Sequence, residues 1–239
     1  IESAVLVDGV AFVCDRAFFL CSELKSVQIP KSVTSIGDEV FVCCSSLRSI
    51  TIPDSVASIG YRAFSYCKFP SIKIPGSVVS FGGYLFIGCE NLEVIDVSEN
   101  SNFVFVDGVL MDKEMTKIIY CILSKSGDYS IQSTVTTICA GAFIGCSKLT
   151  SVVIPNSVKE IGDEAFSSYN KMKLVTIPGK IEVLGANPFN KSFKLSEIRV
   201  VGEGENLKMV DGVLFNKEMT RIVWCSPEKS GSYEIPNTV

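Results

Sequence analysis

The chain of 239 residues is 47% hydrophobic and 20% charged, a composition that favours a folded protein with a sizeable core over a disordered chain. Its formal net charge is −4 and its lysines and arginines form no run in the sequence, which argues against nucleic acid as the main partner. It contains ten cysteines and no histidine, so Ser-His-Asp, Cys-His and His-rich zinc sites are excluded within this segment. No apolar run is long enough to cross a bilayer, so no membrane insertion is expected in this segment.

A phrase of about 23 residues recurs along the whole sequence. Each copy is marked by the residue pair in the place of Ile-Pro, and the steps between successive pairs are 22, 23, 22, 23, 34, 23, 23, 23 and 35 residues. Such a repeat indicates a structural unit that cannot bury its apolar edge alone and must stack on its neighbours. The ten pairs are Val7-Asp8, Ile29-Pro30, Ile52-Pro53, Ile74-Pro75, Val97-Ser98, Ile131-Gln132, Ile154-Pro155, Ile177-Pro178, Val200-Val201 and Ile235-Pro236.

Each ordinary unit predicts one strand followed by a turn. In the third unit, residues 47–52 end in the alternation of a strand with one buried face. Pro53 ends this strand because it has no N–H for a ladder, and Gly60 suits a bend where a side chain would clash. Residues 63–67, Ala-Phe-x-x-Cys, are typical of a short helical or 3₁₀ turn whose large ring fills the interior.

The period selects the fold class, because about 23 residues are too few for a strand plus a long helix. They fit a β-rich solenoid of the leucine-rich-repeat type, with one parallel strand per rung and successive strands about 4.8 Å apart. We expect one continuous domain over residues 1–239. Both ends of the sequence fall inside a repeat, so we also expect the chain to be a piece of a longer protein.

Two long rungs, at about 98–131 and 201–235, depart from the period in the same way. The segment Val-Asp-Gly-Val-Leu at 106–110 recurs at 210–214, 104 positions later. Asp-Gly between apolar residues is a strong signal for a two-residue hairpin turn, so Asp107 and Asp211 are interpreted as turn residues, with calcium binding as a weaker alternative. Each long rung is therefore predicted to replace the Ala-Phe-x-x-Cys turn with a β-hairpin or a three-stranded meander.

The repeated phrase Ile-Pro-x-Ser-Val-x-x-Ile-Gly-x-x-Ala-Phe-x-x-Cys-x-x-Leu resembles the BspA-type leucine-rich repeat. The resemblance covers essentially the whole chain, because Pro, Gly, Phe and Cys recur in register at residues 30–44 and 53–67, and all but Cys at 155–166. It implies a secreted or surface-attached protein of the kind found in host-associated bacteria and some parasitic protists. Members of the family are linked with adhesion to host proteins and with cell–cell contact.

The recurrent cysteines and acids are interpreted as structural. A column of thiols about 4.8 Å apart fits the Cβ separation of a disulfide poorly, so small buried thiols are favoured over disulfides or a metal site. The pairs Asp38-Glu39 and Asp163-Glu164 follow the repeat glycine and are expected at the solvated start of the short helical turn. Tyr169 and Ser192 fill the cysteine position in two rungs. The thiols of this column are Cys21, Cys44, Cys67, Cys89 and Cys146.

The strand residues that face outward are the candidate partner-binding surface, because solenoids usually bind through such an extended face. The hairpin inserts are a rival surface, since they are expected to protrude. The alternative, that this face is simply solvated and binds no ligand in this segment, is given the same weight as the binding interpretation. The candidate residues are Gln28, Thr51, Lys73, Asp96, Thr176, Arg199, Lys25 and Arg48.

The favoured function is non-enzymatic recognition by an extracellular or cell-surface protein, with a protein or a cell-surface glycan as the partner. Catalytic residues, cofactors and metals are not expected, and nucleic acid is not an expected partner. The alternative is a structural spacer whose binding part lies outside this segment. An enzyme with a Ser-Lys or acid pair on the sheet is disfavoured, because histidine is absent and the acids recur at a structural position.

Overall fold

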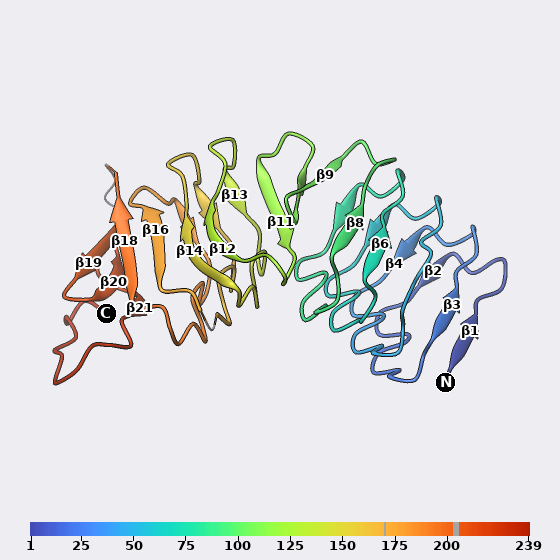
Figure 1. Cartoon of the computed structure of the whole chain (residues 1–239), viewed down its shortest axis with the longest axis horizontal. Coiled ribbons are helices and arrows are strands. Elements are labelled where there is room, and N and C mark those ends of the chain that lie inside the picture. The colour runs from blue at the N-terminus through green and yellow to red at the C-terminus, as the bar shows by residue number, and fades with distance from the viewer. Residues whose placement is uncertain (170, 203–205) are drawn as a thin grey trace. The chain divides into compact units, whose positions relative to one another are not determined.

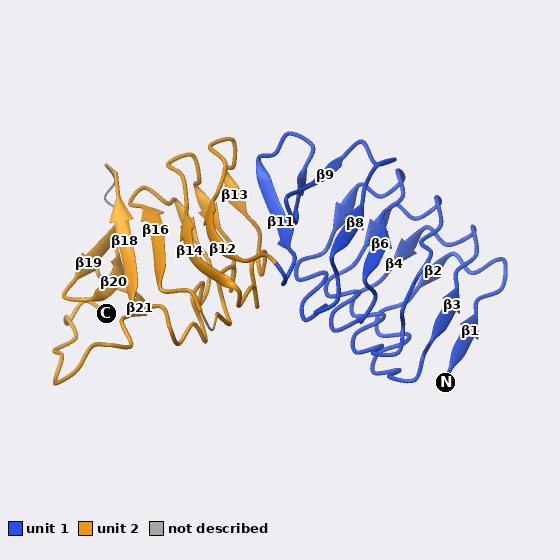
Figure 2. Ribbon diagram, viewed as in Figure 1, with its two compact units in different colours: residues 1–124 blue, residues 125–239 orange. Residues whose placement is uncertain are grey.

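The computed structural model describes residues 1–169, 171–202 and 206–239, and every regular element within them is a β-strand (Figure 1). The chain divides into two compact units, residues 1–124 and 125–239, which are coloured separately in Figure 2. Each unit is a stack of rungs joined by parallel pairing, as the repeat predicted. Continuity of one solenoid from the first unit into the second stays a prediction.

The strands are short, and each unit contains two rows of parallel strands and one antiparallel insert. Unit 1 contains β1 (Ser3–Val5), β2 (Phe12–Val13), β3 (Ser26–Gln28), β4 (Ser35–Ile36), β5 (Ser58–Ile59), β6 (Ser71–Lys73), β7 (Ser80–Phe81), β8 (Val94–Asp96), β9 (Phe103–Val106), β10 (Val109–Asp112) and β11 (Lys117–Cys121). Unit 2 contains β12 (Gly127–Ser130), β13 (Thr137–Ile138), β14 (Leu149–Val153), β15 (Glu160–Ile161), β16 (Leu174–Pro178), β17 (Val183–Leu184), β18 (Glu197–Val201), β19 (Leu207–Val210), β20 (Val213–Asn216) and β21 (Ile222–Cys225).

The predicted strand of each rung forms the main row. In unit 1 this row is β1 beside β3 and β6 beside β8, and in unit 2 it is β12-β14-β16-β18. The strand predicted in the third unit is wrong, because residues 47–52 occupy the corresponding position in the rung without forming a strand. The predicted burial of these residues still holds at both ends of the segment, since Leu47 and Ile52 are buried while Arg48 and Thr51 are exposed.

A second row of two-residue strands ends at the apolar residue just before the repeat glycine and was not predicted. It pairs β2-β4-β5-β7 in unit 1 and β13-β15-β17 in unit 2. Ile36 and Ile59 are neighbours in this row and both are buried. These buried apolar residues therefore also extend the parallel pairing around the rung.

The turn after the repeat glycine contains no helix in the described residues, which corrects the expected helical or 3₁₀ turn. Arg62 and Tyr66 have left-handed φ angles of 53° and 61°, and a left-handed residue at every fourth position interrupts a helix. Alternate N–H groups instead donate to carbonyls of the next rung: Arg62 to Gly83 (3.0 Å), Phe64 to Leu85 (3.2 Å) and Tyr66 to Ile87 (2.6 Å). The turns therefore form a third row of rung-to-rung hydrogen bonds.

The two long rungs contain the predicted meanders, β9-β10-β11 and β19-β20-β21, with the same register. Asp107 and Gly108 have φ angles of 50° and 76°, and Asp211 and Gly212 have 48° and 76°. Positive φ at both central residues defines the type I′ turn that Asp-Gly favours. The interpretation of Asp107 and Asp211 as turn residues is confirmed.

The phenylalanines of the repeat stack on one another in the core. The ring centroids of Phe18, Phe41, Phe64 and Phe86 are 5.5, 5.7 and 5.9 Å apart in succession. In unit 2, Phe143, Phe166 and Phe189 are spaced 5.1 and 6.0 Å apart. One ring per rung thus forms a continuous apolar column in each unit.

The thiol column lies beside the rings and is held by hydrogen bonds. Cys21, Cys44, Cys67 and Cys89 carry free thiols, as expected. The Sγ atoms of Cys44, Cys67 and Cys89 lie 3.2, 3.2 and 3.1 Å from the carbonyl oxygen of the phenylalanine one rung before, to which each S–H donates. Ser192, in the same position, donates its hydroxyl to the Phe166 carbonyl at 3.0 Å. This position therefore accepts a hydroxyl donor in place of the thiol.

We expect these buried thiols to resist alkylation in the native protein. Burial raises the pKa of Cys44 and of Cys89 to about 12 and raises that of Cys67 as well, so the reactive thiolate is scarce at mildly alkaline pH. Cys14 and Cys225 are exposed and should react with iodoacetamide, as mass spectrometry of the labelled peptides would show. All ten cysteines should react after denaturation, and native labelling of Cys67 as fast as Cys14 would contradict its burial.

Candidate partner-binding surface

In unit 1 the main strand row presents a column of outward side chains on a regular backbone. Gln28 on β3 and Lys73 on β6 are exposed, Thr51 is exposed between them in the rung without a strand, and Asp96 on β8 is half-buried. The register places Lys73 directly beside Asp96. The structure therefore brings these four predicted residues onto one face in successive rungs.

Lys25 and Arg48 lie three residues before Gln28 and Thr51, at the start of their strand positions, and both are exposed. The Lys25 ammonium forms an ion pair with Glu2 of the preceding rung at 2.8 Å. Both partners remain largely in solvent, so this pair contributes little to stability. Lys25 therefore keeps its charge available at the surface.

Ion pairs and hydrogen bonds shift the pKa of two residues of the column. The Lys73 ammonium lies 2.8 Å from the Glu99 carboxylate, and this hydrogen bond raises the pKa of Lys73. Hydrogen bonds from Ser98, including one from its backbone N–H at 2.9 Å, lower the pKa of Asp96. Both shifts favour the charged forms, so the column presents opposite charges on adjacent rungs at neutral pH.

A concavity of about 410 Å³ lies where the strands of this face end, and it includes two residues of the column, Thr51 and Lys73. Its walls combine isoleucine and proline side chains with Lys31 and Asp54. Apolar walls with a few charged groups are typical of ligand-binding surfaces. The predicted face of unit 1 is therefore concave at this end of the column.

In unit 2 the predicted residues Thr176 and Arg199 are neighbours on β16 and β18, with Val153 on β14 beside Thr176. Val153 is 43% exposed, and Arg199 is exposed and donates to Glu197 at 2.8 Å within its own strand. Of these two predicted residues, Arg199 is exposed and Thr176 is half-buried.

Sequence reasoning missed a second outward column two residues before the first. It includes Ser26, Ser71 and Val94, which are all exposed, and Val94 lies beside Ser71 in the ladder. The two-residue alternation of a strand would have found it, because residues two apart share a face. The face is therefore two side chains wide and largely small and uncharged on this side.

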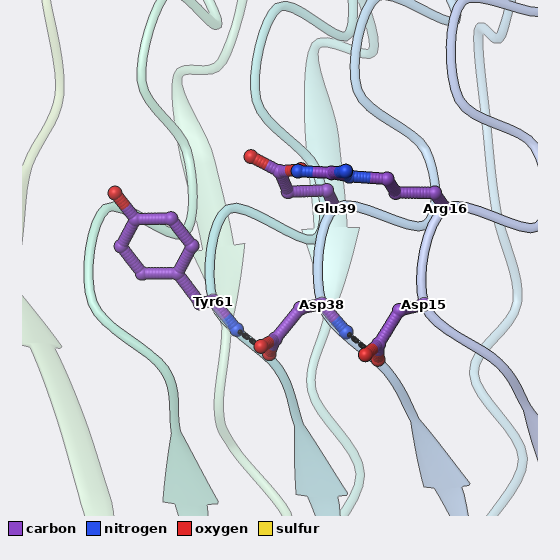
Figure 3. A network of polar contacts seen from close by, with 5 residues as sticks. All are labelled: Asp15, Arg16, Asp38, Glu39 and Tyr61. Carbon is purple, nitrogen blue, oxygen red and sulfur yellow. Dashed lines mark hydrogen bonds and ion pairs between the residues drawn. The ribbon is translucent and has the colours of Figure 1, made fainter.

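The acids after the repeat glycine link rungs together, which corrects their placement at the start of a helical turn. Figure 3 shows that the Asp15 carboxylate accepts the Asp38 N–H (2.8 Å) and that the Asp38 carboxylate accepts the Tyr61 N–H (2.7 Å). Arg16 also forms an ion pair with Glu39 of the next rung. Asp163 accepts the Ala186 N–H at 2.6 Å in the same way. These carboxylates are engaged in backbone contacts at regular positions, so they make a poor catalytic pair.

The inserts present the rival surface, and their turns are held by local polar contacts. Asp112 accepts the N–H groups of Thr116 and Lys117, both at 2.7 Å, and closes the turn between β10 and β11. Asn216 accepts the corresponding N–H of Thr220 at 2.9 Å in unit 2. The equivalent turns of the two inserts are therefore built by the same device from different side chains.

Among the residues that the structure describes, no helix is long and apolar enough to cross a membrane. Over the same residues, no three cysteine or carboxylate side chains gather in a way that could hold a metal ion.

Comparison with known families identifies the repeat. A family model for the BspA type leucine rich repeat region, found in six copies, matches residues 12–122 and 120–222. Together these stretches cover most of the chain, so the resemblance seen in the repeated phrase is confirmed. No curated protein matches the chain.

Several solved structures have a similar fold. A leucine-rich repeat protein from Eubacterium ventriosum is 25% identical with a TM-score of 0.75, and the alignment covers 86% of this chain and 61% of that protein. A leucine rich cell surface protein from Faecalibacterium prausnitzii is 22% identical with a TM-score of 0.58, over 85% and 74% of the two chains. The pneumococcal vaccine antigen PcpA is 20% identical with a TM-score of 0.69, over 86% and 63%. The chain thus spans less than two thirds of the Eubacterium protein.

Proposed function

Because the chain belongs to the BspA-type leucine-rich repeat family, we propose that it is a non-enzymatic recognition module of a secreted or cell-surface protein. Its partner is a protein or a cell-surface glycan, bound on the outward strand face, and its role is adhesion or contact with a host or another cell. One observation carries this proposal: eight predicted outward residues are exposed or half-buried on regularly stacked rungs. Such a preorganised surface loses little conformational entropy on binding.

Further support comes from the proteins of similar fold. One is described as a leucine rich cell surface protein and another as a vaccine antigen. Both descriptions fit a molecule displayed outside the cell. The hydrogen bonds that occupy Asp15, Asp38 and Asp163 favour recognition over catalysis, because these acids serve the stacking of the rungs.

Charge reversal on the strand face of unit 1 is expected to weaken binding without loss of stability. Arg48→Glu combined with Lys73→Glu replaces two exposed cations, and the lost contacts should weaken binding to a responsive host matrix protein at least about tenfold. Surface plasmon resonance against a panel of matrix proteins and glycans measures this. The melting temperature should stay within a few degrees of the parent protein, since substitutions at exposed positions change stability little.

The matched control places the same change in charge on the insert of unit 1. Lys113→Glu with Lys117→Glu alters two exposed lysines near the β10–β11 turn and should leave binding intact. Loss of binding in this control alone would move the site to the inserts. Absence of binding to every ligand of the panel by the folded parent chain would favour the spacer, whose binding part lies in another segment.

A further inference from the structure

Four lysines gather on unit 2 where the chain enters β14, β16 and β18. We call Lys148, Lys171, Lys173 and Lys194 the lysine cluster, and all four are exposed. Lys148, Lys171 and Lys194 are separated by steps of 23 residues, so they occupy the same position in three successive rungs. Stacked rungs are about 4.8 Å apart, which makes these lysines neighbours although they are distant in the sequence.

The alternation of buried and exposed residues directs the lysines outward. Met172, between Lys171 and Lys173, is fully buried, and so are Leu149 and Leu195, which follow the other two lysines. The Lys173 N–H donates to the Thr150 carbonyl at 2.9 Å, and the Ser196 N–H donates to the Lys173 carbonyl at 3.1 Å. The backbone is therefore fixed on both sides of Lys173 while its ammonium remains in solvent.

The lysines border a concavity of about 590 Å³. The segment that follows β21 forms its far wall, where the Ser226 hydroxyl donates to the Ser196 carbonyl at 3.3 Å. This volume lies within the range of small-molecule sites. The residues around the concavity are Thr150, Lys171, Lys173, Lys194, Ser196 and Glu228.

The positive charge of the cluster is not compensated within the described residues. None of the four lysines forms an ion pair there, and like charges on neighbouring strands are destabilising. Of the three nearby carboxylates, Asp128 accepts the hydroxyls of Thr150 (2.7 Å) and Ser151 (2.6 Å), and Glu197 forms an ion pair with Arg199 at 2.8 Å. Only Glu228 is among the residues around the concavity. Three lysines therefore outnumber one carboxylate around it.

The repeat itself does not require lysine at these positions. The residues that precede the equivalent buried apolar residues in unit 1 are Glu23, Ser46, Lys68 and Asn91, and the single lysine among them forms an ion pair with Glu90 at 2.6 Å. Unit 1 has 9 lysines and arginines against 14 acids, whereas unit 2 has 13 against 12. The cluster is thus a local feature of unit 2 that the repeat does not require.

We propose that the lysine cluster binds a sulfated polysaccharide, with one sulfate group per rung. Ammonium groups hold oxyanions such as sulfate as point charges, so a row of lysines can bind them without a fixed two-pronged geometry. A row of charges at the rung spacing suits a linear polymer of evenly placed anions. Phe193, next to Lys194, is 74% exposed and offers an aromatic face beside the charges. This inference rests on the recognition role proposed above and gives it a ligand class.

Binding of a fluorescent heparin oligosaccharide to the whole chain, measured by anisotropy, tests the proposal. The parent protein should bind saturably, and its affinity should fall as salt is added because the contacts are ionic. The triple variant Lys171→Gln, Lys173→Gln, Lys194→Gln should bind about tenfold more weakly or worse. The control Lys159→Gln, Lys180→Gln, Lys208→Gln removes the same charge from exposed sites elsewhere in unit 2 and should bind within about twofold of the parent.

Three results would overturn the site or its ligand. Absence of saturable heparin binding by the folded parent chain would remove the site, and an equal loss in both triple variants would reduce it to general charge attraction. Equal binding of polyglutamate or a single-stranded oligonucleotide would reject a sulfated polysaccharide as the preferred ligand. The Arg48→Glu, Lys73→Glu variant should retain heparin binding, so failure of the strand-face proposal is measured separately.

Discussion

Replacing Gly60 with alanine is expected to lower the free energy of unfolding of unit 1 by about 3 kcal/mol or more. A Cβ atom at this position would contact the Asp38 carboxylate and would lie only 2.5 Å from the carbonyl carbon of Gly37 and 2.6 Å from the Asp38 nitrogen. The clash is with backbone of the preceding rung, which is held by the Asp38–Tyr61 hydrogen bond. The rungs would have to separate there, and urea denaturation monitored by circular dichroism measures the cost.

The chain offers a matched control in the next rung. Gly83 also has a φ angle outside the left-handed region, but a Cβ there would meet only the Tyr61 ring at 3.9 Å. Gly83→Ala should therefore change stability by less than about 1 kcal/mol, with a slight gain possible from a stiffer unfolded chain. Equal effects of the two substitutions would show that close stacking of the rungs is not what Gly60 provides.

Truncation of Phe64 to alanine is expected to cost about 3–5 kcal/mol. The ring is fully buried between Phe41 and Phe86, with centroid separations of 5.7 and 5.9 Å, and it also meets Phe69 edge-on at 5.9 Å. The alanine variant leaves a cavity that the hydrogen-bonded turns on either side cannot close, because their backbones are tied to both neighbouring rungs. Equilibrium denaturation of the two proteins gives the difference directly.

Phe12→Ala provides the comparison, because Phe12 lies on β2 with 60% of its surface exposed. Its loss should cost less than about 1 kcal/mol. A cost below about 1 kcal/mol for Phe64→Ala would mean that the ring is not in the core. The column of stacked phenylalanines would then be wrong for unit 1.

The repeat period and the buried positions could be predicted because the same residue types recur at the same positions in several rungs. Phe41, Phe64 and Phe86 recur in one position, and a position that must be apolar in every rung indicates the interior. The thiol column followed from the same logic. The Asp-Gly turns at 107 and 211 were predictable from local chemistry, since Asp-Gly favours the type I′ turn, in which both central residues have positive φ.

Features that depend on the alignment of rungs could not be predicted so easily. The left-handed residues of the turn include Arg62 and Tyr66, which carry no local signal for positive φ. The contact between Asp38 and Tyr61 spans 23 residues and exists only when the rungs stack in register. The lysine cluster was missed for this reason as well, because Lys171 and Lys194 form no run in the sequence and become neighbours only in the fold.

The row of turns in unit 1 also has an electrical polarity. Each peptide group there accepts from the preceding rung and donates to the following one: Arg16 N–H to the Asp38 carbonyl, Glu39 N–H to Tyr61, and Arg62 N–H to Gly83. Two further series of hydrogen-bonded peptide groups run beside this one in the turn row. The peptide dipoles of all three series point the same way, as they do in an α-helix. The positive end lies at the C-terminal rung of the row, which is opposite to a helix. The second strand row has the opposite sense, because the Gly37 N–H donates back to the Val13 carbonyl and the Gly60 N–H to the Ile36 carbonyl. The peptide dipoles of the turn row are therefore opposed by those of the neighbouring row, and an added charge at either end of unit 1 should feel the turn row only where it lies closest to it.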